Sequence, residues 1–265
     1  MKWIHVTGIG ANWKFFCDNF NESYHTRTAH PQVPPSIDQD HFTSRYEIYP
    51  MGHGRIIQRG APSLRDRMPA NMVHPFDARL REWEIDPDSY PDFETKVQQG
   101  LLDMVEAKKR LWKERGRYQY EHLSDEDLMG FAFAFVFPNI AFSISADILV
   151  MHRWEPHPTD PEKCSYDMWT LVYPTTGDIK ANGGQVYKAK EANYETFEYD
   201  GGRGRIDIAD QVTYQDMGLA AGQQEAWHSK GYRDPYLAGQ ETRVRRFHEV
   251  LNDYIAGDPP RPTNT

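Results

Sequence analysis

The sequence predicts an α+β fold, and three observations lead to this class. Apolar residues recur at helical spacing in the first 30 residues and again between Tyr90 and Arg117. Residues 131–137 instead alternate large and small apolar side chains, as a strand does, and Asp210–Ile255 is again helical in pattern. No internal repeat and no clear linker interrupts this order, so residues 1–265 are interpreted as one domain.

The N-terminal half is expected to contain two helical regions separated by irregular structure. The first 30 residues carry one apolar stripe at helical spacing, formed by Trp13, Phe16, Cys17, Phe20 and Tyr24. From Pro31 to about Asp77 the chain is rich in Pro, Gly and His, so short strands and loops are expected there. Tyr90–Arg117 is predicted as the second helix, and the basic run near its end is interpreted as a solvated face.

Strands are expected at residues 130–137, 140–154 and 165–173, with a Pro-rich turn between the last two. Residues 128–146 carry no charge, and such a stretch is long enough to span a bilayer. However, its period of two and the turn dipeptide Pro138-Asn139 predict two core strands instead of a membrane helix. Residues 174–205 are expected to be loop, and the tail from Gly257 is expected to fray.

Composition excludes several classes of protein. The chain has 265 residues, a net charge of -9, 39% hydrophobic and 13% aromatic residues, which is a globular composition. The acidic balance argues against a nucleic-acid partner, because phosphate contacts need a basic face. Two cysteines, Cys17 and Cys164, cannot form a disulfide framework or a zinc ribbon. With no signal peptide apparent and no membrane segment, a cytoplasmic protein is expected.

The segment from Asp18 to Pro31 is the richest in groups that could carry chemistry. On a helix, Asp18, Glu22 and His25 are spaced to form one polar stripe, whereas His30 lies about 140° round from His25. Both imidazoles can therefore meet one metal ion only if the helix ends or bulges between them. Pro31 provides a reason, because the residue before a proline is pushed out of the helical region. His25 is expected in the last helical turn and His30 just beyond it.

Two histidines at this spacing are a weak signal by themselves, and the alternative is a pair of surface or capping histidines. Two imidazoles and one carboxylate, with open positions, form the arrangement that suits ferrous iron and dioxygen. Spacing alone does not choose that carboxylate among the 39 acidic residues.

Several stretches of the sequence resemble a known family. The first is Asn12-Trp13-Lys14 with Asp18-Asn19-Phe20-x-Glu22-x-Tyr24-His25-x4-His30-Pro31. This block resembles the iron-binding segment of the α subunits of Rieske-type aromatic-ring-hydroxylating oxygenases. Later blocks follow in the family's order and span nearly the whole chain, namely Phe137-Pro138-Asn139, Gln215-Asp216-Met217-x6-Gln224-x4-Ser229-x-Gly231-Tyr232, Glu241 and Phe247-His248.

The resemblance implies a fold and a ligand set. The fold would be a helix-grip (START/Bet v1-like) catalytic domain, in which an antiparallel sheet wraps around a long C-terminal helix. His25, His30 and Asp216 would bind a mononuclear Fe(II) ion. Glu22 would link that iron to the Rieske cluster of a neighbouring subunit. Further side chains are expected around these ligands, namely Asn19, Asp18 and Tyr24.

The resemblance also implies an oxidoreductase that uses O2 to hydroxylate a small apolar or aromatic substrate. The candidate walls of the substrate cavity are Phe131, Phe133, Phe135, Phe137 and Phe142, for which plain core packing is the alternative. The Cys-x-His and Cys-x2-His motifs of a Rieske [2Fe-2S] domain are not in this sequence. A separate Rieske or ferredoxin-type partner is therefore expected to supply electrons within a homo- or hetero-oligomer.

Two other classes of function stay open at this stage. A helix-grip domain can be a non-catalytic pocket that binds an apolar small molecule, and such a carrier would purify without stoichiometric iron. A zinc hydrolase with Glu22 as its base is the third reading, but the HExxH motif is missing and the other blocks would be unexplained.

Overall fold

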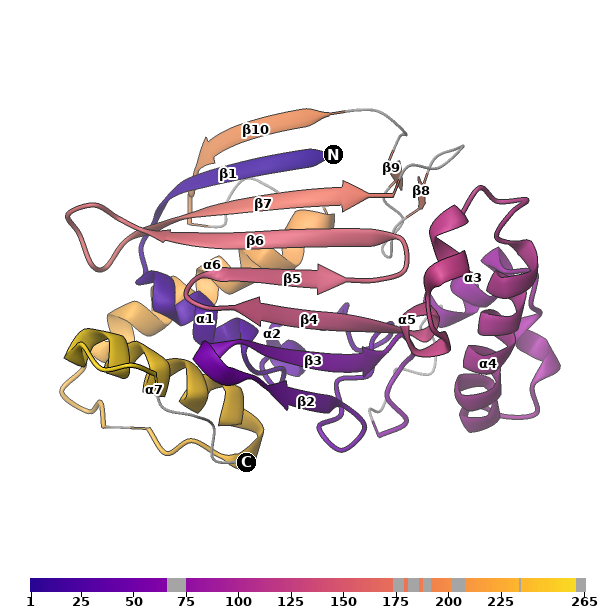
Figure 1. Cartoon of the computed structure of the whole chain (residues 1–265), viewed down its shortest axis with the longest axis horizontal. Helices are drawn as coiled ribbons and strands as arrows, with labels where there is room; N and C mark the ends of the chain where they lie inside the picture. The colour runs from indigo at the N-terminus through magenta and orange to yellow at the C-terminus, as the bar shows by residue number, and fades with distance from the viewer. Residues whose placement is uncertain are drawn as a thin grey trace.

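A computed structural model of the chain contains an eight-stranded sheet with helices packed on one face and at one end (Figure 1). The structure describes residues 1–65, 75–173, 179–180, 186–187, 192–201, 208–233 and 235–260. The order of strands across the sheet is β10-β1-β7-β6-β5-β4-β3-β2, and neighbours are antiparallel except for the parallel pair β1 and β10. This architecture confirms the predicted α+β class.

The strands of the sheet are β1 (Lys2–Ile9), β2 (Arg45–Ile48), β3 (Gly54–Arg59), β4 (Gly130–Val136), β5 (Ile140–Ile144), β6 (Ile148–Pro156), β7 (Cys164–Val172) and β10 (Asn193–Glu198). A separate pair consists of β8 (Ile179–Lys180) and β9 (Val186–Tyr187). The α-helices are α1 (Trp13–Phe20), α2 (Thr26–Ala29), α3 (Pro75–Glu82), α4 (Phe93–Leu111), α5 (Asp125–Met129), α6 (Ile208–Trp227) and α7 (Thr242–Ala256). Short 3-10 turns occur at Pro50–Gly52, Pro87–Ser89, Tyr118–His122 and Gly239–Glu241.

Two apolar cores hold these elements together. The first lies between one face of the sheet and helices α1, α6 and α7, and its buried side chains include Phe16, Phe135, Trp154, Met217 and Phe247. The second joins helices α3, α4 and α5, which lie beyond one end of the strands (Figure 1), and includes Phe76, Leu80, Leu101, Met104 and Leu128. The first core includes the helix that carries Asp216, so it positions the candidate site.

The segment at the N-terminus is a strand, and the predicted helix over the first 30 residues is wrong there. Ile4 and Val6 are buried in the core, while Trp3 and His5 alternate with them and contact Asp167 on the other face of the sheet. β-branched side chains fit such a pleated surface well. The helical stripe begins only at Trp13.

Three further boundaries differ from the expected ones. Residues 140–154 form two strands, β5 and β6, because a turn closed by Ser145 N–H donating to Ile148 O reverses the chain. Strand β10 lies in the stretch expected to be loop, and the C-terminal helical region is divided into α6 and α7. The short strands β8 and β9 also lie within 174–205, whereas residues 174–178, 181–185, 188–191, 202–205 and 261–265 lie outside the described residues.

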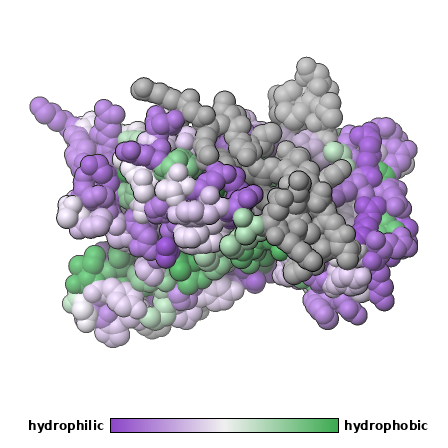
Figure 2. Space-filling model, turned by 90° about the horizontal axis from the view of Figure 1, so that it is seen from above, coloured by the Kyte–Doolittle hydropathy of each residue, from purple (hydrophilic) through white to green (hydrophobic). Residues whose placement is uncertain are grey.

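The predicted reading of residues 128–146 as core strands is confirmed by β4 and β5. Among the residues that the structure describes, no helix is long and apolar enough to cross a bilayer. Hydrophobic residues gather along the lower side of the view in Figure 2, and much of the remaining surface in that view is hydrophilic.

Candidate metal centre

The two histidines of the candidate site flank a single helical turn. The Asn12 side chain accepts a hydrogen bond from Lys14 N–H and caps the start of α1, which ends at Phe20. The chain therefore leaves its helix before His25, earlier than the sequence predicted. His25 is the N-cap of the one-turn helix α2, and His30 is its C-cap, with φ −126° and ψ 65° directly before Pro31. The expected end of the helix at His30 thus occurs, but with α2 between the two imidazoles.

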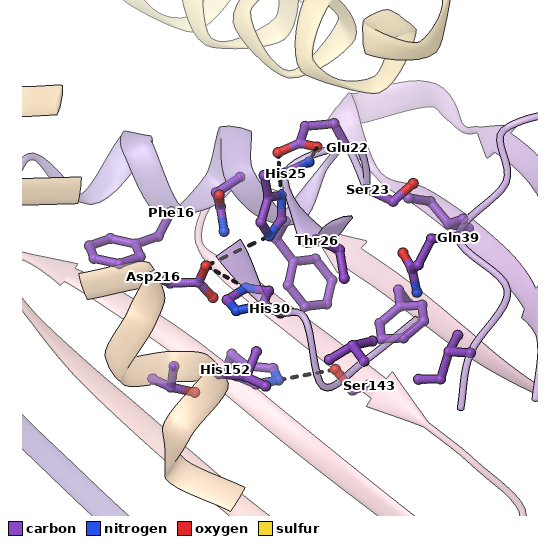
Figure 3. Close-up of a pocket in the computed structure, with 18 of the residues that line it drawn as sticks. Phe16, Glu22, Ser23, His25, Thr26, His30, Gln39, Ser143, His152 and Asp216 are labelled. Carbon is purple, nitrogen blue, oxygen red and sulfur yellow. Dashed lines mark hydrogen bonds and ion pairs between the residues drawn. The ribbon is translucent and has the colours of Figure 1, made fainter. Parts of the chain in front are cut away.

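The structure brings His25, His30 and Asp216 together, although Asp216 follows His30 by 186 residues. The Asp216 Oδ1 atom lies 2.9 Å from His30 Nε2 and 3.6 Å from His25 Nε2. One ligand atom from each residue lies within 4.8 Å of the other two. The imidazole rings are 5.1 Å apart and nearly perpendicular, so their Nε2 atoms approach a common point from different directions (Figure 3).

The far nitrogen of each imidazole is held by an oxygen acceptor. Glu22 Oε1 lies 2.5 Å from His25 Nδ1, and Gln215 Oε1 lies 2.7 Å from His30 Nδ1. Because carboxylate and amide oxygens only accept, both Nδ1 atoms must carry the hydrogen. In the neutral rings, both Nε2 lone pairs then face the Asp216 carboxylate. Three lone-pair donors directed at one point fit a metal ion, and the outer hydrogen bonds fix the imidazole tautomers as metal sites require.

Electrostatics at His30 follow from the same contacts. Burial opposes protonation, but the hydrogen bond and negative charge of Asp216, together with Gln215 and Glu22, outweigh it and raise the pKa of His30 above its ordinary value. A proton and a metal ion would compete for Nε2, since only the unprotonated nitrogen can coordinate. Metal affinity at this site is therefore expected to fall as the pH is lowered.

Of the three other side chains expected around the candidate ligands, one lines the cavity and two do not. Asn19 lines the cavity beside the three ligands. Asp18 instead pairs with His248, at 2.8 Å between Oδ1 and Nε2, and is not among the residues that line the cavity. Tyr24 is 46% exposed, and its hydroxyl donates to Glu241. Of these side chains, only Asn19 reaches the cavity, because Asp18 and Tyr24 face helix α7 and the segment before it.

A cavity of about 250 Å³ opens beside the three ligands, between the sheet and helices α1, α2 and α6. Its apolar lining includes Phe16, Phe20, Val33, Ile37, Ile56, Phe133, Trp154 and Val212. Its polar lining includes Asn19, Glu22, Ser23, Gln39, Gln58, Ser143, His152, Tyr166 and Thr213. A mainly apolar cavity with a few convergent polar groups is the usual form of a small-molecule site.

The expected phenylalanine walls are corrected by this lining. Phe133 faces the cavity, but Phe135 is buried in the core and Phe131 lines a smaller, separate pocket. Phe137 packs on helix α7, and Phe142 points to the opposite face of the sheet because it is the neighbour of Ser143 along the strand. Only the middle of β4 borders the cavity, so the alternation of side chains along this strand does not predict which phenylalanines line the cavity.

The polar groups on the sheet side of the cavity were not found from the sequence. His152 on β6 bonds Ser143 and Tyr166 on the neighbouring strands. Burial lowers the pKa of His152 to about 4, so its ring is neutral near pH 7. The alternation of residues along β6 would place His152 and Trp154 on one face, but sequence alone does not show which face meets the cavity. Gln215 directly precedes the predicted ligand Asp216, but the sequence assigns it no role.

The sequence of the chain matches a known protein family over nearly its whole length. The family model for the catalytic domain of ring-hydroxylating α subunits matches residues 2–257. No curated protein sequence gives a significant match.

Solved structures of quaternary ammonium Rieske monooxygenases resemble the chain. One, an enzyme studied for carnitine oxidation by gut microbiota and inter-subunit electron transfer, has a TM-score of 0.50 and 13% identity, and the match covers 95% of this chain and 49% of that one. Two structures of the monooxygenase CntA, with an inhibitor and with L-carnitine, have TM-scores of 0.47 and 0.45, identities of 13% and 14%, and coverage of 95% of this chain and 48% and 47% of theirs. The chain thus spans about half the length of these structures. The first likeness shows the fold and confirms the predicted helix-grip arrangement.

Proposed function

This chain belongs to the family of ring-hydroxylating α subunits, as a catalytic domain, and we propose that it binds one ferrous ion through His25, His30 and Asp216. The observation that carries the proposal is the convergence of the two Nε2 atoms and the Asp216 carboxylate, with both Nδ1 atoms occupied by acceptors. Two imidazoles and one carboxylate leave open positions, which is the pattern of iron sites that use dioxygen. The bound ferrous ion would supply activation of O2 for hydroxylation of a substrate.

The chain's own residues would prepare this reaction. Gln215 and Glu22 hold the two imidazoles in one orientation, so the ligands need little rearrangement when the ion binds. The cavity beside them is largely apolar, so a small apolar or aromatic molecule would displace its water and lie next to the ligands. Asp216, on a long helix packed in the core, stays within reach of both rings.

Electrons are proposed to come from a Rieske-type partner within an oligomer. The monooxygenase that resembles this chain was studied for inter-subunit electron transfer. Glu22 is the proposed contact, because its buried carboxylate already accepts a hydrogen bond from the metal-facing His25. A second imidazole donated by a partner would bond the same carboxylate and connect the two redox groups.

Iron analysis tests the metal site directly. The purified chain, loaded anaerobically with Fe(II) and desalted, should hold one iron per chain, and His25→Ala, His30→Ala and Asp216→Ala should each hold little. His228→Ala is the matched control, since His228 is exposed and pairs only with Glu162 among the described contacts. Equal iron in all variants would refute the proposal, and an iron-free chain that binds apolar molecules would be a carrier.

The role of Glu22 has its own test. Glu22→Gln should retain iron near stoichiometry but lose single-turnover product when a reduced Rieske partner is supplied, because an amide is a weaker acceptor than a carboxylate. Loss of iron equal to that of His25→Ala would instead make Glu22 a ligand. Full product formation would leave it only a structural role.

A further inference from the structure

Three hydrogen-bonded polar side chains cross the sheet side of the cavity, away from Glu22. Figure 3 shows the contact between two of them, Ser143 and His152. Ser143 Oγ on β5 lies 3.2 Å from His152 Nε2 on β6, and His152 Nδ1 lies 2.6 Å from the Tyr166 hydroxyl on β7. All three side chains line the cavity that also contains the candidate metal ligands. The strands therefore present a hydrogen-bonded group to whatever fills the cavity.

These hydrogen bonds allow the Ser143 hydroxyl to act toward a ligand either as a donor or as an acceptor. A neutral imidazole has one N–H and one lone pair. If Tyr166 donates to Nδ1, His152 Nε2–H donates to Ser143, whose own hydrogen is then available. If Nδ1–H donates to Tyr166, Nε2 accepts from Ser143, whose oxygen lone pairs are then available. Burial keeps His152 neutral near pH 7, so neither arrangement places a net charge in the cavity.

Two other polar side chains that line the cavity, Gln39 and Gln58, already have partners. Gln39 and Gln58 bond each other through their amides, at 3.1 and 3.4 Å, and Gln58 also donates to Ser44. The Ser143 hydroxyl has His152 as its one side-chain partner among the described residues. Ser143 therefore has unused hydrogen-bonding capacity on the sheet side of the cavity.

The lining also restricts the charge of a ligand. Among the described residues of this lining there is no lysine and no arginine, so a carboxylate buried at the Ser143 end would have no cationic side chain beside it, at a large cost. The rings of His152, Trp154 and Tyr166 are stacked on one another at about 5.9–6.0 Å, and Phe16 stacks on Trp154. In this stack the faces of neighbouring rings are turned toward each other, which leaves less ring face for a quaternary ammonium group.

We propose that the substrate of this site is a small neutral molecule with an apolar body and one neutral hydroxyl or carbonyl group, which Ser143 anchors. The proposal rests on the proposed function, because the apolar body would lie between Ser143 and the three metal ligands. Ser143 is then a specificity-determining residue, and His152 and Tyr166 are positioning residues that act through it.

Binding of four probes of similar size tests the proposal without turnover. The iron-free chain is titrated calorimetrically with 4-ethylphenol, ethylbenzene, 4-methylbenzoate and benzyltrimethylammonium. At pH 7 the unchanged chain should bind 4-ethylphenol about 5- to 10-fold more tightly than ethylbenzene, as one net hydrogen bond allows, and the two charged probes most weakly. Ser143→Ala should abolish the preference for the phenol while leaving the affinity for ethylbenzene unchanged.

Ser165→Ala is the matched control, because Ser165 precedes Tyr166 on β7 and so points to the opposite face of the sheet. It should keep the full preference. The proposal would be overturned if the unchanged chain bound the phenol and ethylbenzene equally, bound a charged probe more tightly, or bound no probe. It would also be overturned if the preference for the phenol survived in Ser143→Ala. The probe series on the unchanged chain decides the matter even if the variant does not fold. Iron content is measured separately, so loss of iron binding with the phenol preference intact refutes only the proposed function.

Discussion

At the scale of single residues, Gln215 determines which nitrogen of His30 faces the ligand cluster. Its Oε1 atom accepts from His30 Nδ1 and also from Gln32 Nε2, at 2.8 Å, so the amide is itself held in one orientation. This second contact matters because a freely rotating amide could present its NH2 group instead. Gln215 would therefore act on the proposed metal site through His30, without touching the ion.

Gln215→Leu should weaken Fe(II) binding by about 10- to 100-fold, the usual effect of removing a hydrogen-bond partner of a ligating histidine. The affinity is measured by titration against a competing chelator. Gln223→Leu, an exposed position on the same helix, controls for the change of residue type and should leave the affinity unchanged. Equal affinities for the two variants would mean that His30 is oriented by its packing alone.

The sequence permits a ligand set to be proposed together with Glu22, one of the two residues that orient the imidazoles, but not the other. His25 and His30 lie in one short segment, and Asp216 belongs to a block that the resemblance identifies. Gln215 and Ser143, in contrast, gain their roles from the rotation of helix α6 and from the register of β5 against β6. Those are long-range properties that no local pattern specifies.

At the scale of elements, β1 shows how a local pattern can be overridden. The aromatic stripe that begins at Trp13 predicts a helix. The residues Trp3-Ile4-His5-Val6 before it alternate with a period of two, which is the pattern of a strand. The strand is inserted between β7 and β10, and such pairing with partners more than 150 residues away is invisible in a short window.

Asp167 on β7 fastens β1 and β6 to this part of the sheet. Its carboxylate accepts from Trp3 Nε1 at 3.0 Å, His5 Nδ1 at 2.8 Å and Arg153 at 2.8 Å. Burial alone would raise the pKa of Asp167, but hydrogen bonds from Arg153, Trp3 and His5 bring this pKa below its ordinary value. The carboxylate therefore stabilises the fold above the pKa of the unfolded chain, and this stabilisation is lost as the pH falls through the folded value.

Asp167→Asn should lower the free energy of unfolding by about 2–3 kcal/mol at pH 7, since it weakens several hydrogen bonds to a charged acceptor. The difference from the unchanged chain should shrink as the pH falls below about 4, because the unchanged carboxyl becomes protonated as the pH approaches its lowered folded pKa. Urea unfolding at both pH values measures it. Glu155→Gln, which removes a partly exposed partner of Arg153, should cost under about 1 kcal/mol. A pH-independent difference would show that packing, not charge, is responsible.

At the scale of the whole molecule, the predicted class and the central strands were correct, but the division into two cores was not foreseen. The helices α3, α4 and α5 form their own cluster beyond the strand ends. Helical spacing identifies α4 as amphipathic, yet it does not say whether the apolar face meets the sheet or other helices. The relative placement of such helices depends on contacts between distant segments.

The chain is expected to hold iron but no iron–sulfur cluster. Cys17 and Cys164 are both free and buried, and burial raises the pKa of Cys17 and brings that of Cys164 to about 12, so thiolates are disfavoured. Reconstitution with iron and sulfide should give no cluster absorption in the visible spectrum and no acid-labile sulfide. A [2Fe-2S] ferredoxin treated in parallel verifies the procedure. Stoichiometric sulfide in this chain would contradict the need for a separate electron donor, since two cysteines do not complete the known ligand sets.

The wide separation of the ligands along the chain has a consequence for biosynthesis. Asp216 is translated 186 residues after His30, an interval of roughly 10–40 s at about 5–20 residues per second. Throughout that interval the nascent chain exposes both imidazoles without their carboxylate, and β1 has neither β7 nor β10 to pair with for most of it. Binding of an ion by all three groups would therefore have to follow release of helix α6 from the ribosome.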